Sequence, residues 1–244
     1  MHSTAALRVE TAFDPDEPRQ SRSEVLARYH RMRQIGKHHH SEVMAFLPND
    51  AVFRHARRLG LTHGKTIVLD SPDQLNFAVD LAIYTAPVDR SRAIDRYANA
   101  GRWPPRSEEA AMLEIMREAR FAILLARRRH PIVGLIVQEL TGQGDLWLVD
   151  EGLEQTLPSG AAFATRLFAP GPFVMTAGVG VPLARKTLER VIESSPTLMR
   201  KAPGDAYQDR RFAEAVWRCS IDDGTTERVT FIEPGAQDDR REPS

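Results

Sequence analysis

Apolar residues in the first half of the chain recur at spacings of three, four or seven positions. Ser21 or Ser23 can accept the first free N–H groups of a helix, and from there such a stripe runs to Phe46 and predicts a helix, with Gly36 as a weak point or break. The stripe consists of Val25, Tyr29, Met32, His39, Val43 and Phe46. Similar stripes predict helices over residues 49–59, 72–83, 91–100 and 107–120, and residues 66–69 form a short β-branched run.

The start of one of these helices carries two signals. Ser71 precedes Pro72, and proline is favoured at the first position of a helix. Gln74 lies three residues after Ser71, which is the spacing of a capping box. The pattern therefore predicts a helix that begins at Pro72 with Ser71 as its cap.

Near Arg120 the period of the apolar residues changes from about 3.6 to 2, which indicates strands. The predicted strands cover residues 121–128, 134–140, 145–150, 161–168 and 172–179. Residues 141–145, Thr-Gly-Gln-Gly-Asp, have the length and composition of a tight hairpin. Short strands separated by regular glycine and proline breaks are typical of a small antiparallel barrel.

After Pro182 the helical period returns. Amphipathic helices are predicted over 183–192 and 211–220, with a loop over 194–208 and an optional edge strand over 228–232.

Together these elements predict an α+β fold. A helical N-terminal half packs on a small, mostly antiparallel five-stranded barrel, and C-terminal helices close the structure. We expect one compact unit from about 21 to 232. The predicted segments are a disordered tail over 1–20, a helical region over 21–120, the β-barrel over 121–182, closing helices and the edge strand over 183–232, and a disordered tail over 233–244.

Composition excludes several classes of protein. The chain has 33 basic and 33 acidic residues, so no global field attracts it to nucleic acid or to an anionic membrane. The single cysteine, Cys219, excludes an internal disulfide and a cysteine-based zinc site, and suits a reducing compartment. The longest apolar run, Phe121–Ala126, is far shorter than the roughly 20 residues of a membrane span. The protein is therefore predicted to be cytoplasmic and not to bind membranes.

Three adjacent histidines, His38, His39 and His40, are the candidate metal ligands. Successive residues of a helix turn by about 100°, so the three side chains cannot converge on one ion. His39 also falls on the apolar stripe, which favours a structural role. In an extended segment His38 and His40 would point the same way, and a metal site stays the alternative. We predict no metal and no cofactor.

Two clusters of basic residues are the candidate binding residues. The first is Arg127, Arg128, Arg129 and His130, and the second is Arg54, Arg57 and Arg58. Such clusters can hold phosphates, and the aromatic side chains of the barrel could stack bases. These aromatic residues are Trp147, Phe163, Phe168 and Phe173. Nucleic-acid binding requires both clusters to lie on one face. A solvated helix face explains the second cluster equally well.

No stretch carries a catalytic fingerprint. The glycine pairs at 142–144 and 178–180 lack the strand-to-helix context of a phosphate loop, and Cys219 lies in a helical pattern that favours a core position. Asp80 lies beside a buried stripe. It could serve as a general base, but an ion pair to a neighbouring element is favoured. Other carboxylates near strand ends, among them Glu139, Asp145, Asp150 and Glu151, are expected to be solvated.

Several segments resemble a known family. They are Thr66–Asp73, Asp80–Tyr84, Arg96-Tyr97, Met116–Phe121 and Leu146–Leu153. Over about residues 25–195 the chain resembles a family of uncharacterised cytosolic proteins from alphaproteobacteria. Residues 121–182 also resemble the small β-domain of some bacterial proteins that carry a SEC-C zinc motif, whose cysteines are absent here. The resemblance implies an architecture and transfers no functional residue.

The function favoured by the sequence is a non-enzymatic cytosolic binding or regulatory protein that recognises a protein partner through the barrel or its loops. One alternative is RNA or single-stranded DNA binding through the arginine clusters. Another is an enzyme with a dispersed site that uses Asp80 or a histidine. The sequence sets no oligomeric state.

Overall fold

A curled, antiparallel, five-stranded sheet lies at the centre of the fold. The computed structural model describes residues 20–225 except 88, 102, 141, 143 and 202. The strand order is β5-β4-β3-β6-β7. The strands are β3 (Arg120–Arg129), β4 (Leu135–Glu139), β5 (Gly144–Leu148), β6 (Ala162–Phe168) and β7 (Met175–Leu183). The five predicted strands and the α+β class are confirmed; β4 alternates between buried and half-buried positions, whereas β6 is buried along nearly its whole length.

The sheet is not closed into a barrel, so that part of the prediction is wrong. The two edges of the sheet meet at one point, where Leu148 at the end of β5 bridges Val174 just before β7. The N–H of Val149 donates to the carbonyl of Val174 over 2.9 Å. Pairing stops there because Asp150 caps a short helix, α6 (Glu151–Thr156), which turns the chain away from β7. The apolar pattern of the sequence does not predict this helix.

The first helix, α1 (Arg22–Val43), begins at a capping box and does not break at Gly36. Ser21 Oγ accepts from the N–H of Glu24, and Glu24 Oε2 accepts from the N–H of Ser21. Gly36 is buried, and a Cβ atom there would lie 3.3 Å from Met112 Cε. The glycine therefore lets α1 approach a neighbouring helix closely, and the predicted break is wrong.

The rest of the first half is helical, as predicted. The elements are the 3-10 turn η1 (Met44–Phe46), α2 (Ala51–Arg58), α3 (Pro72–Tyr84), α4 (Ala93–Ala100) and α5 (Glu108–Arg117), with a two-stranded ribbon of β1 (Thr62–His63) and β2 (Thr66–Ile67). Helix α3 begins at Pro72, but its capping box does not form. Gln74 Oε1 instead accepts from the N–H of Asp70 over 2.8 Å, and Ser71 makes no capping hydrogen bond.

Up to residue 225, where the described part ends, four helices follow the sheet. They are α7 (Arg185–Ser194), α8 (Pro196–Met199), α9 (Pro203–Gln208) and α10 (Arg210–Asp222). The predicted loop over 194–208 thus contains two short helices, because Pro196 and Pro203 each stand at the first position of one. The predicted edge strand over 228–232 and both predicted tails lie outside the described residues, apart from Gln20.

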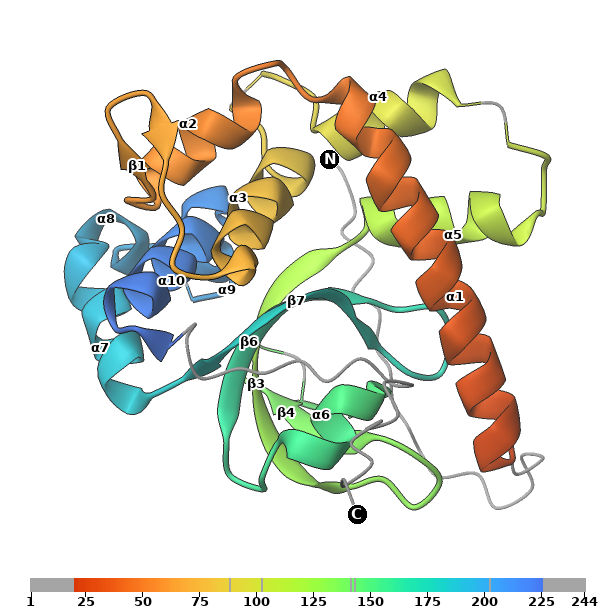
Figure 1. Ribbon diagram of the computed structural model, residues 1–244. Helices are drawn as coiled ribbons and strands as arrows, with labels where there is room; N and C mark the ends of the chain where they lie inside the picture. The colour runs from red at the N-terminus through yellow and green to blue at the C-terminus, as the bar shows by residue number, and fades with distance from the viewer. Residues whose placement is uncertain are drawn as a thin grey trace, which may run out of the picture.

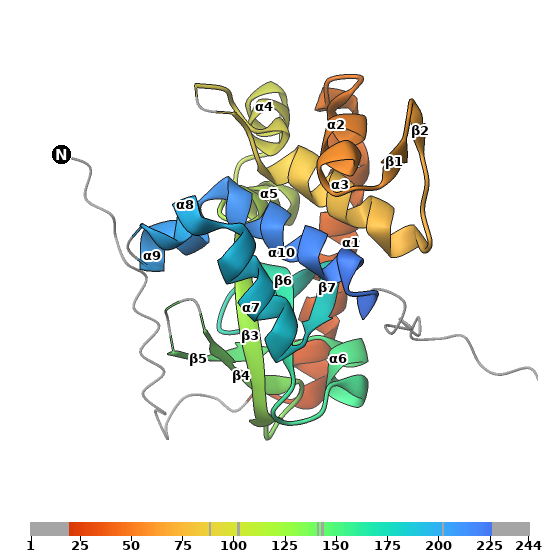
Figure 2. The same cartoon turned by 90° about the vertical axis from the view of Figure 1, so that its left-hand side faces the viewer.

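Helices cover the sheet from two sides (Figure 1 and Figure 2). Helix α1 lies on one side with α4 and α5, while α2, α3, α7 and α10 lie on the other. On the second side Phe77 of α3 stacks on Trp217 of α10 with ring centroids 4.4 Å apart. Leu153 and Leu157 of α6 and its end pack against the third apolar cluster, which consists of sheet residues. Among the described helices, none combines the length and the apolar character that a bilayer crossing requires.

Candidate functional site

Two of the three adjacent histidines, His39 and His40, bind different partners inside the protein. His39 is fully buried; its Nδ1 lies 2.9 Å from Tyr97 Oη and its Nε2 lies 2.9 Å from the carbonyl of Glu109. His40 Nε2 lies 2.6 Å from Tyr84 Oη, and His38 is exposed. Within the described residues, no group of three or more His, Cys, Asp or Glu side chains could hold a metal ion. The structural role favoured for His39 is thus observed.

Asp80 of α3 forms a buried ion pair with Arg166 of β6. Arg166 Nε and Nη2 donate to the two carboxylate oxygens over 2.7 and 2.8 Å, and the side chains are only 5% and 2% exposed. The guanidinium also lies 4.5 Å from the centre of the Tyr84 ring. Burial opposes the charge of Arg166, but Asp80 raises its pKa above the ordinary value. Since both oxygens of Asp80 are engaged, the ion pair is confirmed and Asp80 is not placed to act as a base.

Burial of His40 makes stability depend on pH. Burial lowers the pKa of His40 from 6.5 to about 4; nearby Asp80 opposes this shift, whereas Arg33, Arg166 and His39 add to it. Burial also raises the pKa of Tyr84 well above its ordinary value, so its hydroxyl keeps its proton while it is hydrogen-bonded to neutral His40. The unfolded chain therefore binds a proton at higher pH than the folded chain.

We expect the free energy of unfolding to fall as the pH falls from about 6.5 towards 4, and His40→Gln to reduce this slope. Urea unfolding of both proteins at several pH values measures the difference. Identical pH slopes would show that His40 does not stay neutral in the fold.

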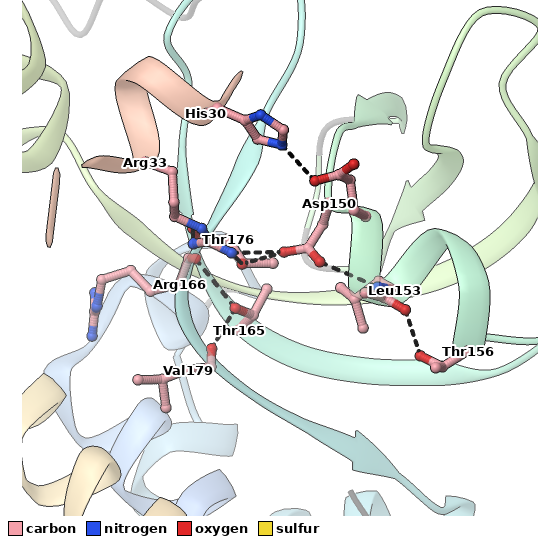
Figure 3. Close-up of polar contacts among 11 residues, drawn as sticks. His30, Arg33, Asp150, Leu153, Thr156, Thr165, Arg166, Thr176 and Val179 are labelled. Carbon is pink, nitrogen blue, oxygen red and sulfur yellow. Dashed lines mark hydrogen bonds and ion pairs between the residues drawn. The ribbon is translucent and has the colours of Figure 1, made fainter. Parts of the chain in front are cut away.

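A second polar cluster joins the two edges of the sheet where closure stops (Figure 3). We call Arg33, Asp150 and Thr176 the seam cluster. The carboxylate of Asp150 accepts from Thr176 Oγ1 over 2.7 Å, from Arg33 Nη2 over 3.0 Å and from the N–H of Leu153 over 3.2 Å. Arg33 Nη1 also donates to the carbonyl of Thr176 over 2.6 Å. The expectation of a solvated Asp150 was therefore wrong.

The seam cluster continues along α1 and α6. His30 Nε2 lies 2.5 Å from Glu151 Oε2, and Arg22 pairs with Glu154 over 3.0 Å. Asp150 thus caps α6 while α1 holds that helix from outside, and the cluster serves to fix the position of α6.

The two arginine clusters lie at opposite ends of the molecule. Arg54, Arg57 and Arg58 are exposed on α2, where Arg54 pairs with Asp50 and Arg58 lies 3.4 Å from Glu214 of α10. Arg127, Arg128 and Arg129 end β3. In both views α2 stands at the top and this end of β3 at the bottom (Figure 1 and Figure 2). The structure does not bring the clusters onto one face.

A β-bulge sets the direction of the β3 arginines. Ala126 pairs with Val137 and Arg128 with Ile136, so Arg127 is an extra residue in β3. Beyond the bulge Arg129 pairs with buried Leu135, and cross-strand neighbours share a face. The bulge therefore places Arg129 on the side of the sheet that α6 covers.

Arg128 and Arg129 line a cleft of about 290 Å³ between the end of β3 and the wall formed by the end of α6 and the segment that follows it. We call it the basic cleft; it is lined by Ala126, Arg128, Arg129, Leu135, Gln155, Thr156, Leu157, Pro158 and Ser159. Within the described part of the chain, neither arginine has an ion pair, and both are exposed. Arginines are the only titratable residues in the lining, and several of its other members are apolar.

The far wall of the basic cleft is tied to β3. Ser159 Oγ donates to the carbonyl of Arg127 over 2.6 Å, and the N–H of Gly160 donates to the carbonyl of Ala126 over 2.7 Å. These bonds fix the wall before any ligand arrives. In the sequence, Pro158, Ser159 and Gly160 indicate only a break between strands. A proline and a serine just before a strand give no sign of the element that they will face.

The aromatic residues proposed for base stacking do not line the cleft. Phe163, Phe168 and Phe173 are buried. Trp147 stacks on His130 with ring centroids 4.0 Å apart, and His130 Nδ1 accepts from the N–H of Ile132 over 3.2 Å. Burial and nearby Arg128 lower the pKa of His130. His130 therefore belongs to the β3–β4 connection beside the cleft.

Comparison with known proteins identifies the family. A family model described as a family of unknown function (DUF7986) matches residues 23–228, so the chain belongs to that family. The searches of curated proteins and of solved structures returned no match. The family carries no described activity, and a function for this chain follows only from its site.

Proposed function

We propose that the protein is a non-enzymatic binding protein that holds an acidic segment of a protein partner in the basic cleft. The observation that carries the proposal is the pair of exposed arginines, Arg128 and Arg129, which have no ion pair within the described residues and line a preformed cleft. Guanidinium groups bind carboxylates with two parallel hydrogen bonds, which gives direction as well as attraction.

The remaining lining favours a polypeptide. Leu135, Leu157 and Pro158 can pack against apolar side chains, while Gln155 and Thr156 can hydrogen-bond to a backbone. A segment that alternates acidic and apolar residues would match both kinds of surface.

Nucleic acid fits this surface less well. No aromatic side chain lines the basic cleft, so bases would find no stacking partner. The second arginine cluster lies at the other end of the molecule, and the chain as a whole carries no net charge. An extended phosphate backbone would therefore meet two separate basic patches.

The residues suggested for an enzyme with a dispersed site do not support one. Asp80 forms an ion pair with Arg166, and His39 and His40 form hydrogen bonds to Tyr97 and Tyr84 inside the fold. We also propose, from the sequence, that the protein acts in the bacterial cytoplasm.

Charge reversal of the basic cleft is expected to weaken peptide binding. We predict that Arg128→Glu with Arg129→Glu raises the dissociation constant for a labelled peptide of alternating glutamate and leucine by at least about tenfold, which is about 1.4 kcal/mol. Fluorescence anisotropy at several salt concentrations measures it. Wild-type affinity should weaken as salt increases, since the contact is partly ionic.

The second arginine cluster supplies the matched control. Arg54→Glu with Arg57→Glu changes the net charge by the same amount at exposed positions of α2 and should leave the affinity for the peptide unchanged. Equal loss in both variants would contradict the proposal, since only the net charge would then matter. Preferential binding of a poly-dT oligonucleotide through the same arginines would replace the protein partner with nucleic acid.

A further inference from the structure

The end of β3 that lines the basic cleft extends beyond its neighbour β6. Strand β6 pairs with β3 only as far as Ala162, which lies opposite Leu125. The next residue of β3, Ala126, bonds through its N–H and its carbonyl to the turn before β6, over 2.9 and 2.7 Å. Strand β3 itself runs on to Arg129. Within the described part of the chain, the last residues of β3 therefore pair with β4 alone.

Arg129 turns its backbone N–H and carbonyl groups towards this open edge. It lies opposite Leu135 in the register of β3 and β4. At the next position, the N–H of His130 donates to the carbonyl of Gly134 over 2.9 Å. Hydrogen-bonded and non-hydrogen-bonded pairs alternate in an antiparallel ladder. The backbone groups of Arg129 therefore point away from β4, to the edge at which the cleft wall bonds to β3.

The wall of the basic cleft does not supply the missing strand. Ser159 bonds to β3 through its side chain, because its Oγ donates to the carbonyl of Arg127 over 2.6 Å. Pro158 has no N–H, and its carbonyl accepts from the N–H of Ala161 over 3.1 Å inside the turn. The wall thus bends away before it reaches Arg129. Among the described residues, none pairs with the backbone of Arg129 at this edge.

We propose that the partner's acidic segment binds as an extended strand, which pairs with the backbone of Arg129 and continues the line of β6. This inference rests on the proposed function and adds to it the conformation of the bound segment. An unpaired strand edge is a template for another chain. An acidic residue directly opposite Arg129 would lie on the same face as its guanidinium group. That one residue would then make two backbone hydrogen bonds and an ion pair.

The surroundings of the edge select the chemistry of the occupant. Arg128 and Arg129 are exposed and have no ion pair within the described residues, so an acidic chain is favoured over a neutral or basic one. A helical segment has its backbone groups already bonded, and a small carboxylic acid has no peptide groups to offer. An extended acidic polypeptide is the occupant that satisfies both the guanidinium groups and the strand edge.

Methylation of backbone nitrogens in the glutamate–leucine peptide tests the strand. Successive N–H groups of a strand point to opposite sides, so only one of the two sets of amides faces β3. A glutamate is expected opposite Arg129. N-methylation of the glutamates should therefore raise the dissociation constant about tenfold, because the methyl group removes the donor and fills its place. N-methylation of the leucines is the matched control and should change it less than about twofold. Fluorescence anisotropy measures both.

Amide hydrogen exchange of the protein gives a second readout. Saturating unmodified peptide should slow exchange of the Arg129 amide at least about tenfold, because this N–H gains an acceptor. Arg128 is the control. Its amide faces β4, since it lies two positions before His130, and its exchange rate should change less than about twofold.

The outcomes separate the inference from the proposed function. Equal loss with both methylated peptides, loss with the leucine-methylated peptide alone, or no loss with either would overturn the inference. So would unchanged exchange at Arg129 while the peptide is bound. In each of these cases the proposed function stands, provided that the unmodified peptide still binds through Arg128 and Arg129. If the unmodified peptide does not bind, the proposed function is wrong and the inference falls with it.

Discussion

Replacement of Asp80 by alanine is expected to lower the free energy of unfolding by about 3–5 kcal/mol. Arg166 is 4% exposed, and both of the nitrogens that bind Asp80 would lose their acceptor. The guanidinium cannot shed its charge at ordinary pH, so the fold would retain an uncompensated buried cation. Urea unfolding at neutral pH measures the loss.

The matched experiment removes the charge and its partner together. Asp80→Leu with Arg166→Met replaces the pair with apolar side chains and should restore stability to within about 1 kcal/mol of the wild type. A single variant that loses less than about 1 kcal/mol would contradict the view of this pair as a buried, mutually dependent unit. So would a double variant no more stable than Asp80→Ala.

Replacement of Asp150 by alanine is expected to cost about 2–4 kcal/mol. The change removes the cap of α6, worth about 1 kcal/mol, and leaves Arg33 and Thr176 without their shared acceptor. Because α6 contributes Gln155 and Thr156 to the cleft wall, its amide protons should exchange faster, and the glutamate–leucine peptide should bind less tightly.

Asp145 supplies the control for this prediction. It lies on β5, the strand that leads to Asp150, but its side chain is exposed. Asp145→Ala should change stability by less than about 0.5 kcal/mol. Similar losses for Asp145→Ala and Asp150→Ala would contradict the structural role of the seam cluster.

The sequence indicated the strands well because each is a short apolar run bounded by turn residues, even where both faces are buried as in β6. It did not indicate how the edges of the sheet meet. The alternation of Leu146 and Leu148 predicts β5 but gives no information on whether its far edge finds a partner. Closure fails because Asp150 starts a helix of six residues, too short for a periodic pattern to reveal.

Long-range pairing explains the other differences. Asp80 lies beside an apolar stripe, which indicated an ion pair. Its partner, Arg166, is 86 positions away and could not be identified from the sequence. Gly36 indicated a helix break because the sequence does not show its neighbour. Met112, from a helix distant in sequence, packs close to the position where a Cβ atom of residue 36 would be. Local signals predicted element types, and tertiary contacts determined what each special residue does.

The sequence predicted one wall of the candidate site but not the other. The run from Arg127 to His130 was conspicuous as a concentration of charge, and the structure places two of its arginines in a cleft. The opposite wall, residues 155–159, lies some thirty positions away and consists of common residue types. The separation of the two arginine clusters depends on the fold alone.

The measurement that tests the central claim most directly is an amide chemical-shift titration of the isotopically labelled protein with the glutamate–leucine peptide. Binding in the basic cleft predicts that the largest shift changes fall at Arg128, Arg129 and residues 155–159, where amides change their surroundings. Residues 54–58 of α2 should not respond. Changes centred on α2, or a titration that leaves the cleft residues unmoved at saturating peptide, would contradict the account.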